Sequence, residues 1–270
     1  MREGNEMTAA AGPNLTYRTD GRTAWITLDN EARMNAMTAA MWAALPGLIA
    51  RAVGEPDVRV IVVRGAGSKA FSAGADISEF ETARTALNAA KYDGLNEAAF
   101  HALFSCPKPV IAMIHGFCMG GGLAIALCCD MRLADDASQF AIPAAKLGIG
   151  YNARWVRPIL AAVPVSGAKE MLFTGRRFSA AEAITMGLVS RVVPSSELET
   201  TVRALADEIA GNAPLTVAAA KLVIDEIVRH PETPDMAKLD AAIEACFESE
   251  DHVEGRRAFL EKRKPVFKGK

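Results

Sequence analysis

Two glycine-rich turns are the part of this sequence best suited to chemistry that uses the main chain. One lies within residues 72–77 (SAGADI) and the other within 116–122 (GFCMGGG), each between an expected strand and an expected helix. At such a turn the backbone N–H groups have no partner within the helix, and glycine lets a ligand approach the main chain closely. The helix dipole adds positive potential. The turns therefore suit a phosphate group or an oxygen that becomes negative during a reaction.

The phosphate interpretation is the weaker of the two. The glycines of the second turn do not match G-x-G-x-x-G, and no Lys-Ser/Thr follows them as in a P-loop. An oxyanion site needs two N–H donors that converge on one oxygen, and the two turns could supply one each. In a third interpretation the glycines only allow tight packing of helix against strand, and spacing alone does not separate it from the oxyanion site.

The elements around these turns predict an α/β fold. Strands and helices alternate without hairpin signals, which favours parallel strands joined by crossovers. The continuous apolar run of residues 109–114 is typical of a strand that is covered on both faces. We expect strands at 23–28, 58–64, 109–114, 131–135 and 138–143, and helices at 38–53, 84–104 and about 121–128.

Several helix boundaries are predicted from capping residues. Thr38 is expected to cap the first helix, and Pro46 to kink it or end it early. From about residue 195 the chain is expected to be helical. Ser196 with Glu199, and Asp251 with Glu254, match the spacing of capping boxes, and Pro214 is expected to begin a helix. These signals predict a helical C-terminal extension on the α/β core.

Composition excludes several classes of protein. Half of the 270 residues are hydrophobic and the formal net charge is −2, so a nucleic-acid partner is not expected. No apolar run is long enough for a membrane span, and the first residues lack the apolar core of a secretory signal. The five cysteines are odd in number and form no C-x-x-C pair, so neither a disulfide framework nor a zinc site is indicated. We expect a cytoplasmic protein without a metal.

Four segments, in this order and at this spacing, resemble the crotonase superfamily, the enoyl-CoA hydratase/isomerase group. They are KAFSAGADISEF (69–80), KPVIAMIHGFCMGGGLAIALCCDMRLA (108–134), SQFAIPAAKLGIG (138–150) and FTGRRFSAAEAITMGLVSRVVP (173–194). The resemblance runs from about residue 13 to the C-terminus. It implies an α/β fold, a crotonase-type spiral of ββα units with a C-terminal helical trimerisation region. We therefore expect a disordered leader (1–12), an α/β core with the acyl-CoA site (13–200) and a C-terminal helical region (201–270).

The resemblance also implies a substrate and a site. The substrate would be an acyl-CoA thioester, so coenzyme A would enter as part of the substrate and no separate cofactor is expected. The oxyanion hole would consist of the main-chain N–H groups of Ala75 and Gly121. Either Lys264 or Phe267 would reach the coenzyme A of a neighbouring subunit in a homotrimer or homohexamer. The substrate-binding residues would be Arg33 near the coenzyme A phosphates, Ala73, Asp76 and Ile77 along the adenine and pantetheine, and Gly120, Ala124 and Ala144.

Two departures from the family pattern bear on the reaction. Hydratases of the family carry two glutamates that handle water and proton, and the matching positions here are Ala124 and Ala144. A methyl group neither holds water nor moves a proton, so hydration by that pair is not expected. Tyr151 and Asn152 are the candidate catalytic replacements. Tyr151 would donate a proton or a hydrogen bond, and Asn152 would orient a substrate group; both also suit an ordinary loop.

Other reactive side chains have simpler interpretations. Glu79 and Glu81 follow the first turn and suit a solvated helix start better than the acyl pocket. Lys146 is expected to be exposed, and Asp130 to accept from backbone donors. Cys118 precedes the glycines, but as a nucleophile it would need a base, and a packed thiol is the simpler assignment.

The sequence supports two main functions. The first is an enzyme that stabilises a thioester enolate and carries out isomerisation, decarboxylation or retro-aldol cleavage, or hydration through replacement residues. The alternative is a catalytically silent protein that binds acyl-CoA. A third, RNA binding, finds no support in the mild acidity of the chain.

Overall fold

The computed structural model describes residues 9–10, 14–79 and 89–270. Its larger sheet has seven strands in the order β1-β2-β3-β4-β6-β8-β11. β1 and β2 pair antiparallel, as do β2 and β3, and every later pair is parallel. The strands are β1 (Ala9–Ala10), β2 (Leu15–Asp20), β3 (Thr23–Leu28), β4 (Val60–Gly65), β6 (Val110–Ile114), β8 (Met131–Asp135) and β11 (Arg191–Val193).

A smaller sheet carries the two glycine turns. Its order is β10-β9-β7-β5, and β5, β7 and β9 run parallel. Residues 117–119, which the sequence assigned to a turn, form the central strand β7, so the turn itself is confined to the glycines that follow. The strands are β5 (Ala70–Ser72), β7 (Phe117–Met119), β9 (Gln139–Ala141) and β10 (Phe178–Ser179).

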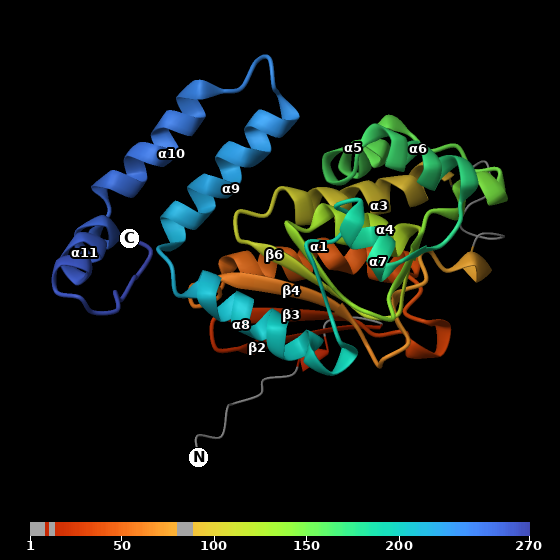
Figure 1. Ribbon diagram of the computed structural model, residues 1–270, viewed down its shortest axis with the longest axis horizontal. Helices are drawn as coiled ribbons and strands as arrows, with labels where there is room; N and C mark the ends of the chain where they lie inside the picture. The colour runs from red at the N-terminus through yellow and green to blue at the C-terminus, as the bar shows by residue number, and fades with distance from the viewer. Residues whose placement is uncertain (1–8, 11–13, 80–88) are drawn as a thin grey trace.

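Helices cover both faces of the larger sheet (Figure 1). The α-helices of the described chain are α1 (Ala39–Gly54), α3 (Ala89–Phe104), α4 (Gly121–Cys128), α5 (Ala153–Ala162), α6 (Val165–Thr174), α7 (Ala180–Thr185), α8 (Leu198–Ala210), α9 (Pro214–Arg229), α10 (Met236–Glu248) and α11 (Glu250–Leu260). Successive side chains of a strand point to opposite faces. Ile26 therefore packs with Leu45 of α1, and the neighbouring Trp25 packs with Val202 of α8.

The expected α/β order and several element boundaries are confirmed. The predicted strand 23–28 is β3, and 109–114 is the fully buried β6 with helices on both sides. Pro214 begins α9 as predicted. α3 spans the later part of the predicted helix 84–104, and residues 84–88 lie outside the described chain. Within the predicted leader, Ala9 and Ala10 pair with β2.

The first helix is capped as predicted but does not stop at its proline. The Thr38 hydroxyl accepts a hydrogen bond from the Met41 N–H at 3.2 Å. α1 then runs through Pro46 to Gly54. The expected early end is wrong because residues on both sides of Pro46, including Leu45 and Ile49, are buried in the core and hold the helix together.

Both predicted C-terminal capping boxes are wrong. Glu199 pairs with Arg64 and Arg203 instead of capping α8, which begins at Leu198 without a side-chain cap. Asp251 lies inside α11, where its carboxylate accepts from the N–H groups of Lys268 and Gly269 at 2.7 and 2.8 Å. Ser249 caps that helix, through the His252 N–H. Sequence spacing alone did not distinguish a cap from a carboxylate recruited by a distant segment.

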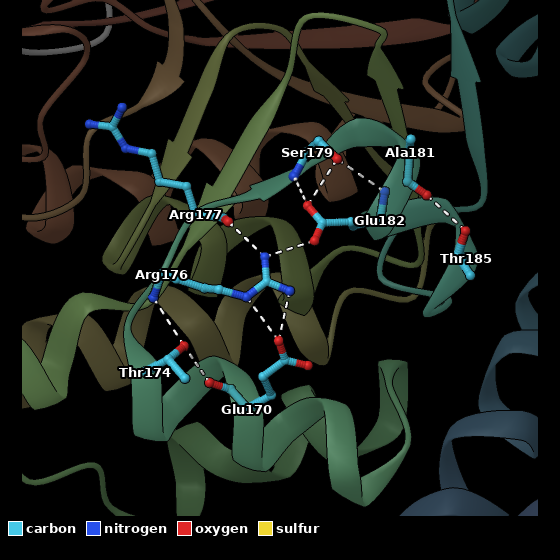
Figure 2. Close-up of polar contacts among 8 residues, drawn as sticks. All are labelled: Glu170, Thr174, Arg176, Arg177, Ser179, Ala181, Glu182 and Thr185. Carbon is cyan, nitrogen blue, oxygen red and sulfur yellow. Dashed lines mark hydrogen bonds and ion pairs between the residues drawn. The ribbon is translucent and has the colours of Figure 1, made fainter.

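A capping box does occur at the start of α7 (Figure 2). The Ser179 hydroxyl accepts from the Glu182 N–H, and the Glu182 carboxylate accepts from the Ser179 N–H at 2.8 Å. Arg176 then bridges Glu182 and Glu170, at 2.7 Å from each, and so joins α6 to α7. Hydrogen bonds from Ser179 and Arg176 hold the pKa of Glu182 at about 2, so this link stays charged.

The last three helices extend away from the sheet (Figure 1). α9 has no buried residue and α10 has one, Leu239. None of the helices in the described part of the chain has the length and apolar character that crossing a bilayer requires.

Candidate active site

The two glycine turns meet at the end of the smaller sheet. β5 leads into the first turn and β7 into the second, and these strands are adjacent and parallel. A Cβ atom built on Gly74 would lie 3.2 Å from the Gly121 amide nitrogen, and one on Gly121 would lie 3.4 Å from the Ala75 amide nitrogen. The two amides expected to form an oxyanion hole therefore lie side by side.

Hydrogen bonds on either side of Ala75 fix the direction of its N–H. Met37 donates to the Gly74 carbonyl at 2.7 Å and accepts from the Asp76 N–H at 2.9 Å. This parallel bridge uses the residues that flank Ala75 and leaves the Ala75 N–H on the other side of the chain. It donates to no acceptor in the described residues.

The Gly121 N–H also has no hydrogen-bond acceptor among the described residues, because it lies at the start of a helix. Gly121 is the first residue of α4, where N–H groups have no intrahelical partner. Gly120, one residue earlier, donates its own N–H to the Ala141 carbonyl at 2.8 Å. Within the described chain the Gly121 N–H has no acceptor. The site thus presents two adjacent, unpaired donors, one of them at a helix N-terminus, where negative charge is favoured.

The three consecutive glycines serve three different purposes. Gly120 has a φ of +48°, in the region that favours glycine. At Gly121 a Cβ would meet the Trp42 ring at 3.1 Å, beside the paired amides. At Gly122 it would lie 2.6 Å from the Ser72 Cβ, so this glycine allows α4 to pack on β5. Tight packing explains Gly122, but it does not account for the free amide of Gly121.

A cavity of about 130 Å³ opens beside the two amides. Its walls come from the first turn, from α1, α3 and α4, and from the segment between β9 and α5. The described lining residues are Trp42, Ala73, Gly74, Ala75, Tyr92, Asn96, Phe100, Gly120, Gly121, Ala124, Ile142, Pro143, Ala144, Leu147, Ile149, Tyr151 and Trp155. Most of this surface is apolar, which suits a hydrocarbon group.

The described lining contains no carboxylate, imidazole, amine or guanidinium group. Ala124 and Ala144, at the glutamate positions of the family, both line the cavity. Tyr151 lines it as well, and burial, with a smaller effect of Cys128, raises the pKa of its phenol to about 12. Tyr151 is therefore protonated at neutral pH and acts as a hydrogen-bond donor rather than as a base.

Asn152 is not part of the cavity, which corrects the sequence prediction. It is exposed, and its side-chain oxygen accepts from the Trp155 N–H at 3.1 Å as the N-cap of α5. An asparagine just before a helix is among the preferred caps. The helix start therefore accounts for Asn152, and Tyr151 is left as the candidate from this segment.

The residues predicted along coenzyme A lie around the first turn. Ala73 is exposed at the cavity rim. Arg33 donates to both carboxylate oxygens of Asp76, at 2.9 and 2.7 Å, and also to the Ser78 hydroxyl. Ile77 opens a short 3-10 helix, Ile77–Glu79. The Asp76 carboxylate is therefore occupied by Arg33. The Asp76 main-chain N–H donates to the Met37 carbonyl, and its own carbonyl accepts from the Glu79 N–H.

The remaining acidic and basic candidates lie away from the reacting centre. The Glu79 carboxylate accepts from the Ala39 N–H at 2.7 Å, at the start of α1. Lys146 is exposed, and Asp130 accepts from the Val110 N–H and from Lys221, at 2.6 and 2.8 Å. Glu81 lies outside the described residues.

The thiol and imidazole near the second turn do not form a nucleophilic pair. Cys118 is fully buried, and this burial raises the pKa of its thiol far above the usual range. His115 is also buried, and burial, reinforced by Arg64, lowers the pKa of its imidazole. Neither residue lines the cavity. Cys118 is therefore a packed thiol, as the sequence analysis preferred.

Two polar residues of the lining were missed from sequence. Asn96 on α3 and Trp155 on α5 both line the cavity, and each carries a buried polar atom, Oδ1 and Nε1, without a partner among the described residues. Asn96 occurs in an ordinary amphipathic helix and Trp155 follows a loop, so no motif marks them. Only the fold brings them to the cavity that holds Ala124 and Ala144.

The fold and the site define a class, an α/β protein with two adjacent, unpaired main-chain donors at the wall of an apolar cavity. The family model of enoyl-CoA hydratase/isomerase matches residues 18–270. The chain belongs to this family, which lies in the crotonase superfamily, and is an acyl-CoA-processing enzyme of that group.

Individual relatives agree with this assignment. The chain is 33% identical to a short-chain-enoyl-CoA hydratase of Clostridium acetobutylicum, over 93% of this chain and 96% of that protein. It is 36% identical to a carnitinyl-CoA dehydratase of Escherichia coli O157:H7, over 80% and 84% of the two chains. A crystal structure from Magnetospirillum magneticum, described as an enoyl-CoA hydratase/carnithine racemase, superposes with a TM-score of 0.93 at 35% identity and covers 97% of both chains.

Proposed function

We propose that this enzyme binds an acyl-CoA thioester with its carbonyl oxygen between the N–H groups of Ala75 and Gly121. The single observation that carries the proposal is the pair of adjacent, unpaired amides at the wall of an apolar cavity. Two donors directed at one oxygen stabilise the negative charge that develops on it when the thioester becomes an enolate. Because the donors are main-chain groups, no side chain is needed for this step.

The coenzyme A moiety would follow the first turn. Ala73 is exposed at the cavity rim, and Asp76 and Ile77 follow it within the same turn. The Arg33 side chain, 55% exposed, offers positive charge to the phosphates. Asp76 holds the Arg33 guanidinium at 2.7 Å and thereby limits its freedom. Coenzyme A is then part of the substrate, not a separate cofactor.

Stabilisation of the enolate would be the main contribution of the protein to the reaction. Without a carboxylate pair in the described lining, hydration by that pair is not part of the proposal. Double-bond isomerisation, decarboxylation and retro-aldol cleavage all pass through a thioester enolate and form the candidate reactions. Tyr151, protonated and at the cavity wall, would donate a hydrogen bond to the acyl group or to its leaving fragment.

A panel of enoyl-, malonyl- and 3-hydroxyacyl-CoA thioesters, with products identified by mass spectrometry, tests the proposal. We expect turnover of at least one member, reduced roughly 100- to 1,000-fold by Gly121→Pro, which removes one donor. Proline is well tolerated at the first position of a helix, so α4 should still form. Turnover unchanged in a correctly folded Gly121→Pro variant would contradict the proposal.

A second function, catalytically silent binding of acyl-CoA, is favoured by the lack of any carboxylate, imidazole, amine or guanidinium group in the described lining. It shares every binding residue with the first. Tight binding of thioesters without turnover across the whole panel would establish it in place of the enzyme.

We also propose that the C-terminal helices join copies of this chain into a trimer, or into a hexamer made of two trimers. The support is the apolar surface that α9, α10 and α11 leave uncovered. Its exposed side chains include Ile224, Ile227, Val228, Ile243, Phe247, Val253, Phe259 and Leu260. Light scattering after gel filtration would test this; a monomer at micromolar concentration would contradict it.

A further inference from the structure

The three candidate reactions differ in what they need before the enolate forms. Isomerisation begins when a base removes a proton from carbon, and retro-aldol cleavage begins when a base removes a proton from a hydroxyl group. Decarboxylation of a 2-carboxyacyl thioester begins without a proton transfer, because the bond to the carboxylate breaks and its electron pair becomes part of the enolate. The groups around the cavity therefore bear on which reaction takes place.

The described lining of the cavity offers no base. It contains no carboxylate, imidazole or amine. Burial raises the pKa of the Tyr151 phenol to about 12, so this group stays protonated at neutral pH. The other phenol of the lining, Tyr92, is 2% exposed, and its oxygen accepts a hydrogen bond from the Trp42 indole at 3.2 Å. Of the three reactions, decarboxylation is the one that these described groups can start.

Ala124 provides the place for a carboxylate. It lies three residues after Gly121 on α4, it is half-buried, and it lines the same cavity. Side-chain positions three apart on a helix are neighbours, about 5–6 Å apart. A carboxylate on C2 stands two bonds from the thioester carbon, so it fits within this distance when the carbonyl oxygen is at the Gly121 N–H. The methyl group of Ala124 leaves room for it, whereas a glutamate would repel it.

The two ends of the cavity favour movement of the negative charge. The wall around the acyl group is mostly apolar, and no positive group of the described lining compensates a carboxylate there, which raises its free energy. The N–H groups of Ala75 and Gly121 have no acceptor in the described chain. As carbon dioxide leaves, the charge passes from the apolar wall to these donors, so the transition state is stabilised more than the bound substrate.

The size of the cavity limits the acyl group. Its volume of about 130 Å³ is similar to that of an engineered apolar cavity, about 150 Å³, that binds one benzene molecule. The acyl group beyond the thioester therefore has roughly six non-hydrogen atoms or fewer. A carboxylate and a short alkyl group on C2 fall within this limit.

We propose that the enzyme decarboxylates a short 2-carboxyacyl-CoA, a malonyl-type thioester. The bond between C2 and the carboxylate carbon breaks, carbon dioxide leaves, and the electron pair forms the enolate. Water then gives a proton to C2 and becomes hydroxide, so the product is the acyl-CoA that is one carbon shorter. This inference rests on the proposed function, because the enolate needs the donors of Ala75 and Gly121, and it reduces three candidate reactions to one.

Thioesters that start in different ways test the inference. Malonyl-CoA and methylmalonyl-CoA, each with ¹³C in the free carboxylate, would be compared with 3-pentenoyl-CoA and 3-hydroxybutyryl-CoA, with products measured by mass spectrometry. We expect release of ¹³CO₂ from a malonyl-type thioester with a kcat/KM at least about 100-fold above that of the other two, which lack the contribution of a base. Faster isomerisation or retro-aldol cleavage would overturn the inference.

Hydrogen exchange tests the lack of a base without the carboxylate. Propionyl-CoA would be incubated with the enzyme in deuterium oxide and its mass followed against a sample without enzyme. It should keep both C2 hydrogens over the time in which the malonyl-type thioester is consumed, because no group removes them. Exchange as fast as decarboxylation would show a base at the site and overturn the inference.

Two substitutions at Ala124 test the place of the carboxylate. Ala124→Glu and Ala124→Gln add side chains of nearly equal size, and only the first adds negative charge. Release of carbon dioxide should fall at least about 10-fold further in Ala124→Glu, because the two carboxylates repel each other. Equal losses in the two variants would overturn this placement.

Glu81 is the one carboxylate of residues 80–88, which lie outside the described chain. Glu81→Gln should leave the release of carbon dioxide unchanged, and a large loss would overturn the inference. A thioester that binds with its carbonyl band at lowered frequency, while no malonyl-type thioester loses carbon dioxide, would overturn this inference alone. Failure of every thioester to bind would overturn the proposed function as well.

Discussion

The two ends of the cavity are built differently. At the amide end, the groups next to the free donors are bonded within the fold: the Gly74 carbonyl to Met37, the Gly74 N–H to Ser72 and the Gly120 N–H to Ala141. At the acyl end, the two positions where the family resemblance leads us to expect glutamates are alanines, Ala124 and Ala144. Asn96 and Trp155 there carry polar atoms without partners among the described residues.

This difference separates features that depend on the backbone from features that depend on side-chain identity. The donors at Ala75 and Gly121 depend on backbone geometry, so any sequence that keeps the glycine turns keeps them. The acyl end depends on side-chain identity and can change without altering the fold. In the proposed function, the family fold supplies the two donors for the enolate, and the acyl end selects the substrate and the reaction.

The largest effect is expected from restoring the two glutamates. We expect the natural protein to hydrate crotonyl-CoA very slowly. Ala124→Glu combined with Ala144→Glu should raise this rate by about 100- to 10,000-fold, because positioned acid–base groups contribute on this scale. Hydration would be monitored through the loss of absorbance as the conjugated thioester is consumed.

The control is Ala145→Glu, which adds one of the two carboxylates a single residue away from Ala144, on an exposed position outside the described lining. It should leave hydration unchanged. Fast hydration by the natural protein would show that another group already moves the proton. The acyl end would then not lack acid–base chemistry, and the contrast between the two ends would be wrong.

An intermediate effect is expected from weakening the amide end. Ser72 is fully buried; its hydroxyl donates to the Asn35 carbonyl at 2.8 Å and accepts from the Gly74 N–H at 3.2 Å. Ser72→Ala leaves both backbone groups unpaired and should lower the free energy of unfolding by about 1–3 kcal/mol, and kcat with it. Denaturant titration would measure the loss.

Ser190→Ala is the control, since that exposed hydroxyl makes one comparable bond, to the Arg132 carbonyl at 2.9 Å. It should cost little in stability or turnover. Equal losses in the two variants would show that the bonds under the first turn have no special importance.

The smallest effect concerns the charge beside the first turn. Burial raises the pKa of the Asp76 carboxyl, but hydrogen bonds from Ser78 and Arg33 outweigh it and hold the pKa below its usual 3.8. A carboxyl with a lowered pKa contributes stability above its unfolded-state pKa, and this contribution is lost as the pH falls through the folded-state value.

Asp76→Asn should therefore be less stable than the wild type at neutral pH, by less than about 1 kcal/mol because Arg33 is half exposed. The difference should shrink below about pH 4, where the wild-type carboxyl becomes protonated. Thermal unfolding from pH 7 to pH 3 would show this convergence, and a difference that grows toward low pH would refute the assignment.

Sequence patterns predicted the elements whose signals are local. The apolar run at 109–114 gave the buried β6, and Thr38 gave the cap of α1. Each of these follows from residues within one turn or one strand. The short strands β5 and β7, which lead directly into the two turns, were not predicted. The capping boxes at Ser196 and Asp251 failed because distant partners, Arg64 and the backbone near Gly269, took the carboxylates.

The candidate site, too, could be predicted from sequence only where the signal is local. The positions of Ala75 and Gly121 could be inferred from glycine turns and family resemblance, because backbone geometry follows the chain. Asn96 and Trp155 could not be found, since they come from separate helices and carry no motif. Asn152 looked reactive, but its neighbour in the chain was a helix start, and it serves as a cap.

The most direct test of the central claim is the infrared carbonyl stretch of a bound acyl-CoA carrying ¹³C at the thioester carbon. Two hydrogen bonds from Ala75 and Gly121 polarise the carbonyl, so the band should move to lower frequency on binding to the wild type, and move back toward its solution position in Gly121→Pro. A bound thioester whose band keeps its solution frequency in the wild type would contradict the claim that these two amides form the site of chemistry.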